Sequence, residues 1–313
     1  MTASSAPATT MPRAATAERT RARRPRRNWG NLSLVSPFLV FYVLFLVGPL
    51  VYDVVLSFFN TSLVKGGLGS FAGFGNYTEL FRDHQFWSAM WHTILFTLVS
   101  TPPLVILPLF FAIVVNRIKR GQWFFRLAFF LPYILPSAAI ALVWLFIYEP
   151  GYGLIAGFFN LIGVGDPGWL SDPNVALYSI VIVTVWWTIG FNFVLYLAGL
   201  QDINPDLYEA AGLDGASQWQ QTWRITIPML GRTTTLVTVL QVIASLKIFD
   251  QIYLILQGGP NYSSRPAIEW IYDTAFTSQR VGYASAASFI LFIVILIVSF
   301  IWLALVRRQE SGV

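Results

Sequence analysis

Few side chains in this sequence could do covalent chemistry. It contains no cysteine and only two histidines, His84 and His92. A chain without thiolates and with two histidines cannot form the usual zinc sites, and it has no cysteine nucleophile. None of its three lysines follows a glycine, as the lysine of a phosphate-binding Gly-Lys-Ser/Thr loop does. We therefore expect no metal, no cofactor, no catalytic residue and no ATP hydrolysis by this chain itself.

Three ionisable residues stand out because they lie inside long apolar runs, where a charge costs about 2.5–3.5 kcal/mol at the centre of a membrane helix. Asp53 is near the end of its run, which favours a place at the membrane interface. Lys247 and Asp250 are three residues apart, a spacing that puts both on one face of a helix. They form either a charge pair facing a wet cavity or a structural pair at a subunit interface.

The composition identifies the elements that must position these residues. Of the 313 residues, 56% are hydrophobic and 11% are charged, against about a quarter charged in soluble domains. A bilayer core needs about 20 apolar helical residues. Six such runs predict an all-α, polytopic membrane protein with spans at 34–58, 90–115, 125–148, 175–200, 234–257 and 284–306. We expect a transmembrane domain at 34–308.

The basic residues set the expected topology. Most Arg and Lys residues lie in alternate segments between the spans, which places both termini in the cytoplasm by the positive-inside rule. Residues 1–33, rich in Ala, Thr, Pro and Arg, are expected to be a disordered basic cytoplasmic tail. The tail either sets topology while touching anionic membrane lipid or binds a partner. The basic residues are not interleaved with aromatic ones, so we expect no nucleic-acid partner.

Prolines interrupt the first three spans: Pro49, Pro102, Pro103, Pro108, Pro132 and Pro136. Each proline removes a helical hydrogen bond, and lipid tolerates this only if a neighbouring helix or water satisfies the freed carbonyl. The kinks suit either a moving bundle with a cavity or ordinary packing.

The segment 201–233 is the longest polar stretch between spans, and the topology places it in the cytoplasm. Asn204 and Pro205 are typical of a helix start, and "DLYEAAGL" continues that helix to a turn at Gly215. Ser217 can cap a second helix, "QWQQTWRIT", which Pro228 is expected to stop. The sequence predicts a helix, glycine turn and helix whose apolar side chains need a covering surface.

Motifs along about 280 residues carry a resemblance to a known family. "EAAGLDGA" followed by "ITIP" resembles the EAA loop of the permease subunits of binding-protein-dependent ABC importers. "FLPYILPSAAIALVWLF", "SLKIFDQIYLILQGGPN" and "AFTSQRVGYASAASFILF", in this order, resemble the carbohydrate branch of that family. Thr222 stands where an aromatic residue is common, and Arg232 replaces a frequent second proline.

The resemblance implies a type I ABC importer permease fold in a bacterial inner membrane. It implies a carbohydrate importer in which this chain forms half of the pathway, as a heterodimer with a second, similar permease. A separate cytoplasmic ATPase and an extracytoplasmic solute-binding protein complete the expected complex.

The resemblance also assigns candidate residues to two sites. The ATPase would contact the central EAA positions, Glu209, Ala210, Ala211, Asp214 and Gly215. The family lines its sugar pathway from the fourth and fifth spans, where the polar and aromatic candidates are Trp187, Asn192, Gln241, Ser245, Lys247 and Asp250. Tryptophans at such positions also serve as packing or lipid-facing residues. The sequence does not identify the sugar.

Two other classes remain as alternatives. A proton-coupled secondary carrier usually has ten or more spans and inverted repeats, whereas six spans without an evident repeat disfavour it. An intramembrane enzyme is disfavoured by the missing cysteine and the scarcity of histidine.

Overall fold

The chain is helical almost throughout the part that the structure describes. In this computed structural model the described residues are 29–118, 120–163, 165 and 167–310. Helix accounts for 74% and strand for 2%, which confirms the all-α class. The chain divides into two compact units, 1–50 and 51–313. Most of the expected tail, residues 1–28, lies outside the described residues, and helix already begins at Trp29.

The described part of the first unit, residues 29–50, is a single apolar helical segment. It comprises α1 (Trp29–Tyr42), the π-helical turn η1 (Val43–Val47) and the beginning of α2 (Gly48–Leu56). The apolar stretch Val35–Leu56 is 22 residues long, enough to cross a bilayer.

The second unit contains the remaining helices and one small hairpin. Strands β1 (Phe59–Asn60) and β2 (Ser70–Phe71) pair antiparallel, Phe59 opposite Phe71. The helices are α3 (Gly75–Arg82), α4 (His84–Asn116), α5 (Gln122–Ile134), α6 (Ser137–Tyr148), α7 (Leu154–Leu161), α8 (Ala176–Gln201), α9 (Asp206–Leu213), α10 (Gln218–Gln221), η2 (Thr222–Thr226), α11 (Ile227–Met229), α12 (Gly231–Leu246), α13 (Asp250–Ile255), α14 (Ala267–Tyr272), η3 (Asp273–Thr277) and α15 (Val281–Glu310).

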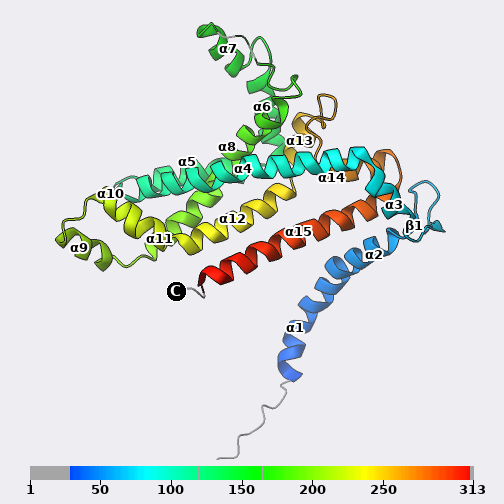
Figure 1. The fold of residues 1–313 in the computed structure, drawn as a ribbon, viewed down its shortest axis with the longest axis horizontal. Coiled ribbons are helices and arrows are strands. Elements are labelled where there is room, and N and C mark those ends of the chain that lie inside the picture. The colour runs from blue at the N-terminus through cyan, green and yellow to red at the C-terminus, as the bar shows by residue number, and fades with distance from the viewer. Residues whose placement is uncertain (1–28, 119, 164, 166, 311–313) are drawn as a thin grey trace, which may run out of the picture. The chain divides into compact units, whose positions relative to one another are not determined.

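Helix α4 is the central helix around which this unit packs. It packs against α8 and α12, while α5 crosses α8 (Figure 1). Phe96 of α4 and Phe193 of α8 are fully buried in two separate core clusters along this packing. The α5–α8 crossing depends on Gly190, because a Cβ there would overlap the carbonyl of Phe129. A helix without a side chain at the crossing lets the two backbones approach closely.

The third predicted span is a broken pair of helices rather than one helix over 125–148. Helices α5 and α6 meet at an angle of 98°. Leu135, between them, has extended backbone, the conformation favoured for a residue that precedes proline. Pro136 then lacks the N–H that would continue α5. The predicted proline interruption is therefore present, and it is a full break.

The fifth predicted span, 234–257, also ends earlier than expected. Helix α12 stops at Leu246, and α13 starts at Asp250. At 1.5 Å per residue, the 16 residues of α12 span about 24 Å, less than a bilayer core. The segment before it, Gln218–Met229, meets α12 at 60°.

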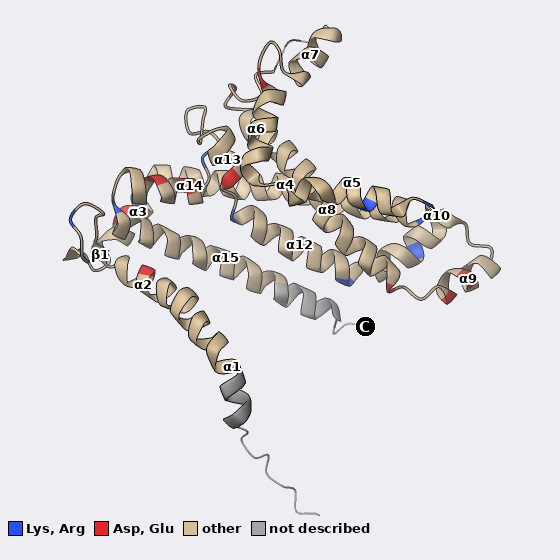
Figure 2. Cartoon of the chain, turned by 180° about the vertical axis from the view of Figure 1, so that it is seen from behind, with Lys and Arg blue, Asp and Glu red and all other residues tan. Residues whose placement is uncertain are grey.

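Among the described residues, four helical segments are each long and apolar enough to cross a membrane: Val35–Leu56, α4, α8 and Val281–Trp302. The number rises to six if each of the two bent pairs counts as one span. Charged residues, blue and red in Figure 2, gather at loops and helix ends, while the long helices carry few. The four long segments correspond to the predicted spans 34–58, 90–115, 175–200 and 284–306, and the α5–α6 pair corresponds to 125–148. Of the second bent pair only α12 overlaps the predicted span 234–257.

Candidate functional site

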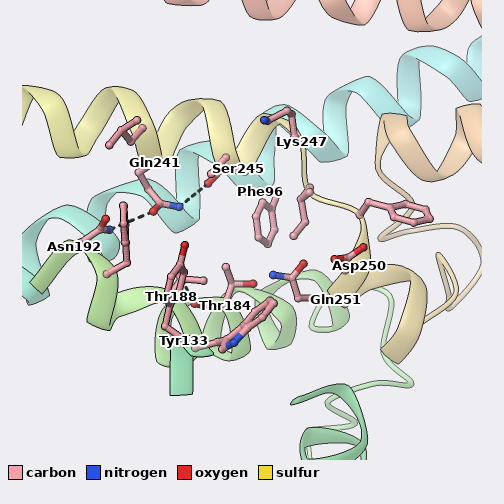
Figure 3. Close-up of a pocket in the computed structure, with 16 residues that line it drawn as sticks. Phe96, Tyr133, Thr184, Thr188, Asn192, Gln241, Ser245, Lys247, Asp250 and Gln251 are labelled. Atoms are coloured by element: carbon pink, nitrogen blue, oxygen red, sulfur yellow. Dashed lines mark hydrogen bonds between the residues drawn. The ribbon is translucent and has the colours of Figure 1, made fainter. Parts of the chain in front are cut away.

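A cavity of about 260 Å³ lies between α4, α8 and the α12–α13 break. All six residues predicted for the pathway line it: Trp187, Asn192, Gln241, Ser245, Lys247 and Asp250. Figure 3 shows polar side chains from both the α8 side and the α12–α13 side around this space, which we call the central cavity. The structure brings the six together, and their role in transport stays a prediction.

Asn192 satisfies a carbonyl that a proline has freed. Pro108 has no N–H, so the carbonyl of Leu104, four residues earlier in α4, loses its helical donor. Asn192 Nδ2 donates to that carbonyl at 2.7 Å. The expectation that a neighbouring helix compensates an interrupted span is met at this position.

The same amide belongs to a buried polar network that joins three helices. Asn192 Nδ2 also lies 3.2 Å from Gln241 Oε1, and Gln241 Nε2 donates to Ser245 Oγ at 3.1 Å. Ser245 Oγ is 3.1 Å from Ser100 Oγ on α4. These bonds occupy both amide N–H groups of Asn192 and one of the two of Gln241, so both side chains link helices of the bundle; Figure 3 shows the bonds that join Asn192, Gln241 and Ser245.

Other polar groups around the cavity remain open to a ligand. Trp187 Nε1 is buried and has no hydrogen-bond partner in the described part of the chain. Lys247 and Asp250 are exposed, and Gln251 beside them also lines the cavity. Because the Trp187 N–H has no surface open to the cavity, Lys247, Asp250 and Gln251 are the groups that a ligand would meet directly.

The prediction that Lys247 and Asp250 lie on one face of a helix is wrong. Lys247 caps the end of α12 with φ −102° and ψ 20°, so the helix breaks before Asp250 begins α13. The described residues contain no ion pair between the two side chains within 4.0 Å. Sequence spacing of three residues gives a shared face only in an unbroken helix.

Several cavity residues were not selected from the sequence. Phe96 comes from α4, Tyr133 from α5, Phe249 from the α12–α13 break and Gln251 from α13. The break itself was missed, because the apolar run continues through "KIFDQIYLIL" without proline or glycine. Tyr133, a polar aromatic residue within an apolar span, was the signal available for α5.

The polar segment 201–233 folds as predicted at its first helix and turn. Asn204 Oδ1 accepts the N–H of Asp206 at 3.0 Å, which caps the start of α9. Glu209, Ala210 and Ala211 lie in α9, Asp214 follows its last residue, and Gly215 has φ +79°. Glu209, Ala210, Asp214 and Gly215 are exposed, and Ala211 is half-buried.

The second helix starts as predicted and ends at Met229, one residue beyond the predicted stop at Pro228. Ser217 and Gln220 form a reciprocal capping box at the start of α10. Beyond it the chain stays helical through a π-helical turn, Thr222–Thr226, and Pro228 lies inside α11. The chain bends by 60° directly after this segment, so Pro228 lies at the end of the second helix, where its missing N–H favours a stop.

Arg117, at the end of α4, holds this second helix. Its guanidinium donates to the carbonyl of Gln218 at 3.3 Å and to the hydroxyl of Thr222. Thr222 is 6% exposed, so the position where the family commonly has an aromatic residue is here a buried polar contact. Tyr208 OH, 3.0 Å from Thr226 Oγ1, links the first helix to the second.

The outer side of this segment is apolar and uncovered. Leu213 is 91% exposed, and the rings of Trp219 and Trp223, 69% and 54% exposed, meet edge to face at 5.5 Å. Exposed apolar side chains grouped in this way are typical of a protein-contact surface.

The comparisons with known proteins agree with this architecture. Residues 65–311 match the family model described as binding-protein-dependent transport system inner membrane component. The chain belongs to that family. Members of this family are permeases, so the resemblance seen in the sequence motifs is confirmed, and the chain is a multi-pass inner-membrane transport subunit.

Individual relatives cover most of the permease. The sulfoquinovosyl glycerol transport system permease protein of Agrobacterium fabrum is 33% identical over 279 residues, 88% of this chain and 90% of the relative. The trehalose/maltose transport system permease protein of Thermococcus litoralis is 33% identical over 77% of this chain and 81% of its own. A chain of a bacterial alginate ABC transporter, solved with an alginate pentasaccharide-bound periplasmic protein, matches with a TM-score of 0.80 at 23% identity, covering 90% and 96%. That likeness shows the type I permease fold.

In the described residues, no group of three or more His, Asp or Glu side chains could hold a metal ion. The candidate sites described above are two: the central cavity and the exposed segment around Gly215.

Proposed function

We propose that this permease is one subunit of an ATP-driven carbohydrate importer and that the central cavity is its half of the sugar pathway. The observation that carries the proposal is the cavity itself, where aromatic rings and a few open polar groups converge between helices. Sugar sites combine aromatic faces with a small number of placed hydrogen-bonding groups. The names of two relatives point the same way, since one is a transporter of sulfoquinovosyl glycerol and the other of trehalose and maltose.

The expected partner subunits are inferred from the missing ATP-binding motif and from the exposed segment around Gly215. The chain carries no phosphate-binding Gly-Lys-Ser/Thr motif, so the ATPase is a separate polypeptide. We place that ATPase against the exposed segment with Glu209, Ala210, Ala211, Asp214 and Gly215. A second permease completes the pathway as a heterodimer, and an extracytoplasmic solute-binding protein delivers the sugar. Both termini are cytoplasmic in this arrangement, in keeping with the positive-inside rule.

Vesicle uptake tests the proposal. The permease is co-expressed with its neighbouring transport genes, purified as a complex and reconstituted in vesicles. Uptake of labelled trehalose, maltose, lactose and sulfoquinovosyl glycerol is then measured with the solute-binding protein, with and without ATP. We expect uptake of at least one of these compounds that requires ATP and survives a protonophore.

The opposite outcome identifies the alternative. Uptake that continues without ATP and collapses with a protonophore would mean a proton-coupled secondary carrier. As a matched control, the exposed Tyr152 is replaced by alanine; this side chain lies outside both candidate sites, so uptake should not change.

A further inference from the structure

Arg117 joins the polar segment 201–233 to the long helix α4. It follows Asn116, the last residue of α4, and its guanidinium reaches the second helix of the segment, at the carbonyl of Gln218 and the hydroxyl of Thr222. These two partners lie 101 and 105 residues further along the chain. The contact therefore exists only in the folded chain, where it bridges two distant parts of the sequence.

Close packing does not fill the space around this contact. A cavity of about 250 Å³ lies between the ends of α4 and α8 on one side and α9, α10 and η2 on the other. Asn116, Arg117 and Thr222 are among the residues that line it. Packed interiors transmit a displacement because their side chains interlock, whereas a cavity leaves the facing walls free to move separately. The Arg117 side chain ties the two walls together.

The end of α4 is itself held in place. Gln122, the first residue of α5, donates through Nε2 to the carbonyls of Val115 and Asn116 at 3.3 and 3.1 Å. Two of the carbonyls that a helix end leaves without partners are thus satisfied. A displacement of Arg117 is therefore passed on to α4 instead of being absorbed by fraying of its last turn.

The acceptor on the other wall is fixed as well. The Thr222 hydroxyl donates to the carbonyl of Gln218 at 2.8 Å and still has lone pairs with which to accept from Arg117. Thr222 opens the π-helical turn η2, and the last residue of this turn, Thr226, bonds to Tyr208 of α9. Turns of this kind inside helices are frequent at functional sites. Through Thr222, Arg117 is connected to both helices of the segment.

Helix α4 leads from Arg117 to the central cavity. Leu104 lies about 20 Å further along the helix, and its carbonyl is bonded to Asn192. Ser100, one turn beyond Leu104, lies 3.1 Å from Ser245, which lines the cavity. One helix thus carries both the contact with the segment and the polar network beside the cavity.

We propose that Arg117 is a positioning residue that transmits movement of the segment to α4 and so couples ATP hydrolysis to rearrangement of the central cavity. This inference rests on the proposed function, which places the ATPase against the segment. The segment is also joined to α12 by the chain itself, but the helices bend there by 60°. A bend absorbs a displacement by changing its angle, so the direct contact through Arg117 is the stiffer route.

The test measures sugar taken up per ATP hydrolysed. The complex is reconstituted with saturating loaded solute-binding protein, and the probe is whichever of labelled trehalose, maltose, lactose or sulfoquinovosyl glycerol the wild type takes up. We expect Arg117→Gln to lower this ratio about tenfold, the lower end of what one hydrogen bond to a charged group contributes. Recovery of the ATPase with the permease should not change, because the exposed face of the segment keeps its residues.

Thr222→Val tests the same contact from the other wall. Valine keeps the shape of the side chain and removes the hydroxyl, while the carbonyl of Gln218 still accepts from Arg117. The loss should therefore be smaller than in Arg117→Gln. Because both variants break one shared contact, the double variant should have the same ratio as Arg117→Gln alone.

Two further variants separate the contact from the charge. Arg117→Lys keeps the charge but lacks the fork of donors, so it should restore only part of the ratio. Arg120→Gln removes an exposed arginine from the same turn, for which the described part of the chain contains no hydrogen bond or ion pair. This control should match the wild type.

Three outcomes would overturn the inference. An unchanged ratio in Arg117→Gln, with a wild type that transports sugar, would refute the role of Arg117 and leave the proposed function standing. A loss of ATPase recovery in that variant would show that Arg117 only maintains the docking surface. A wild type that takes up none of the four compounds with ATP would refute the proposed function, and this inference with it.

Discussion

Asn192 Nδ2 on α8 donates, at 2.7 Å, to the carbonyl of Leu104 on α4, the group that Pro108 leaves without its helical donor. One side chain thus stabilises the interruption of α4 and ties it to α8 beside the central cavity. Through Gln241 the same network reaches α12. The hydrogen bond that Pro108 removes from α4 is thus replaced by a side-chain network that joins α4, α8 and α12.

Replacing Asn192 with alanine should destabilise the permease. The Leu104 carbonyl would then be buried without a donor, at a cost of about 1–3 kcal/mol. Thermal unfolding of the purified complex in detergent measures the loss. Thr188→Val is the control, because Thr188 Oγ1 only adds a second bond, 2.7 Å, to a helix carbonyl.

Pro108→Ala provides a sharper version of this test. Alanine restores the N–H that the Leu104 carbonyl lacks, so Asn192→Ala should cost clearly less in that background than in the wild type. Equal costs in the two backgrounds would mean that Asn192 does not compensate the proline.

Gly215→Val should weaken ATPase association while leaving the permease in the membrane. Gly215 has φ +79°, a conformation that a side chain disfavours by about 1–2 kcal/mol. A Cβ there would meet no atom within 4 Å, so the cost comes from the backbone alone. We expect about a tenfold lower affinity, measured by co-purification of the ATPase from membranes.

Gly212→Ala is the matched control for this variant. Gly212 lies within α9 and has room for a Cβ, whose nearest neighbour is 3.9 Å away. Alanine is the better helix former, so association should hold or improve. If Gly215→Val retained normal ATPase recovery and uptake, the segment would be only a connector.

Neutral replacements of Lys247 and Asp250 should have additive effects on uptake. The helix break separates the two side chains, and no ion pair joins them in the described part of the chain. Residues without a shared contact usually add within about 0.3–0.5 kcal/mol. Uptake rates of Lys247→Met, Asp250→Asn and the double variant give the comparison; a double variant that is more active than either single one would reveal a direct pair.

The permease should lose stability as pH rises from about 4 to about 7, because of Glu269. This carboxyl is 1% exposed, and burial together with the Asp273 charge raises its pKa to about 7, against the lowering effect of Arg265. In the unfolded chain its pKa is about 4.3. The folded state therefore binds a proton that the unfolded state releases, so the stabilisation is full below pH 4.3 and is gone above pH 7.

Thermal unfolding of the assembled complex at pH 5 and pH 8 tests this effect against Glu269→Gln, which cannot ionise. The variant should have a smaller difference between the two pH values than the wild type. Burial also raises the pKa of Asp273, so part of the pH dependence of stability should remain in both proteins. An identical pH dependence in the two proteins would exclude Glu269 as its source.

The sequence by itself determined the elements of this permease that depend on local chemistry. Apolar run length is enough to locate the four long helical segments of the described residues that could cross a membrane, since a bilayer demands about 20 apolar residues of a spanning helix. The Ser217 cap and the Gly215 turn follow from side chains acting on their own backbone. The six pathway candidates also lie together, because they were taken from two spans that the family places around one path.

Only the tertiary structure decided which of those candidates are engaged and where the helices break. Asn192 and Gln241 are held by α4 and by each other, over sequence separations that no local pattern encodes. The run "SLKIFDQIY" reads as one helix, yet it breaks after Leu246 to pack Ile248 and Ile252 into the core beside α6 and α8. Local propensity is a weak preference of tenths of a kcal/mol per residue, and burying two isoleucines outweighs it.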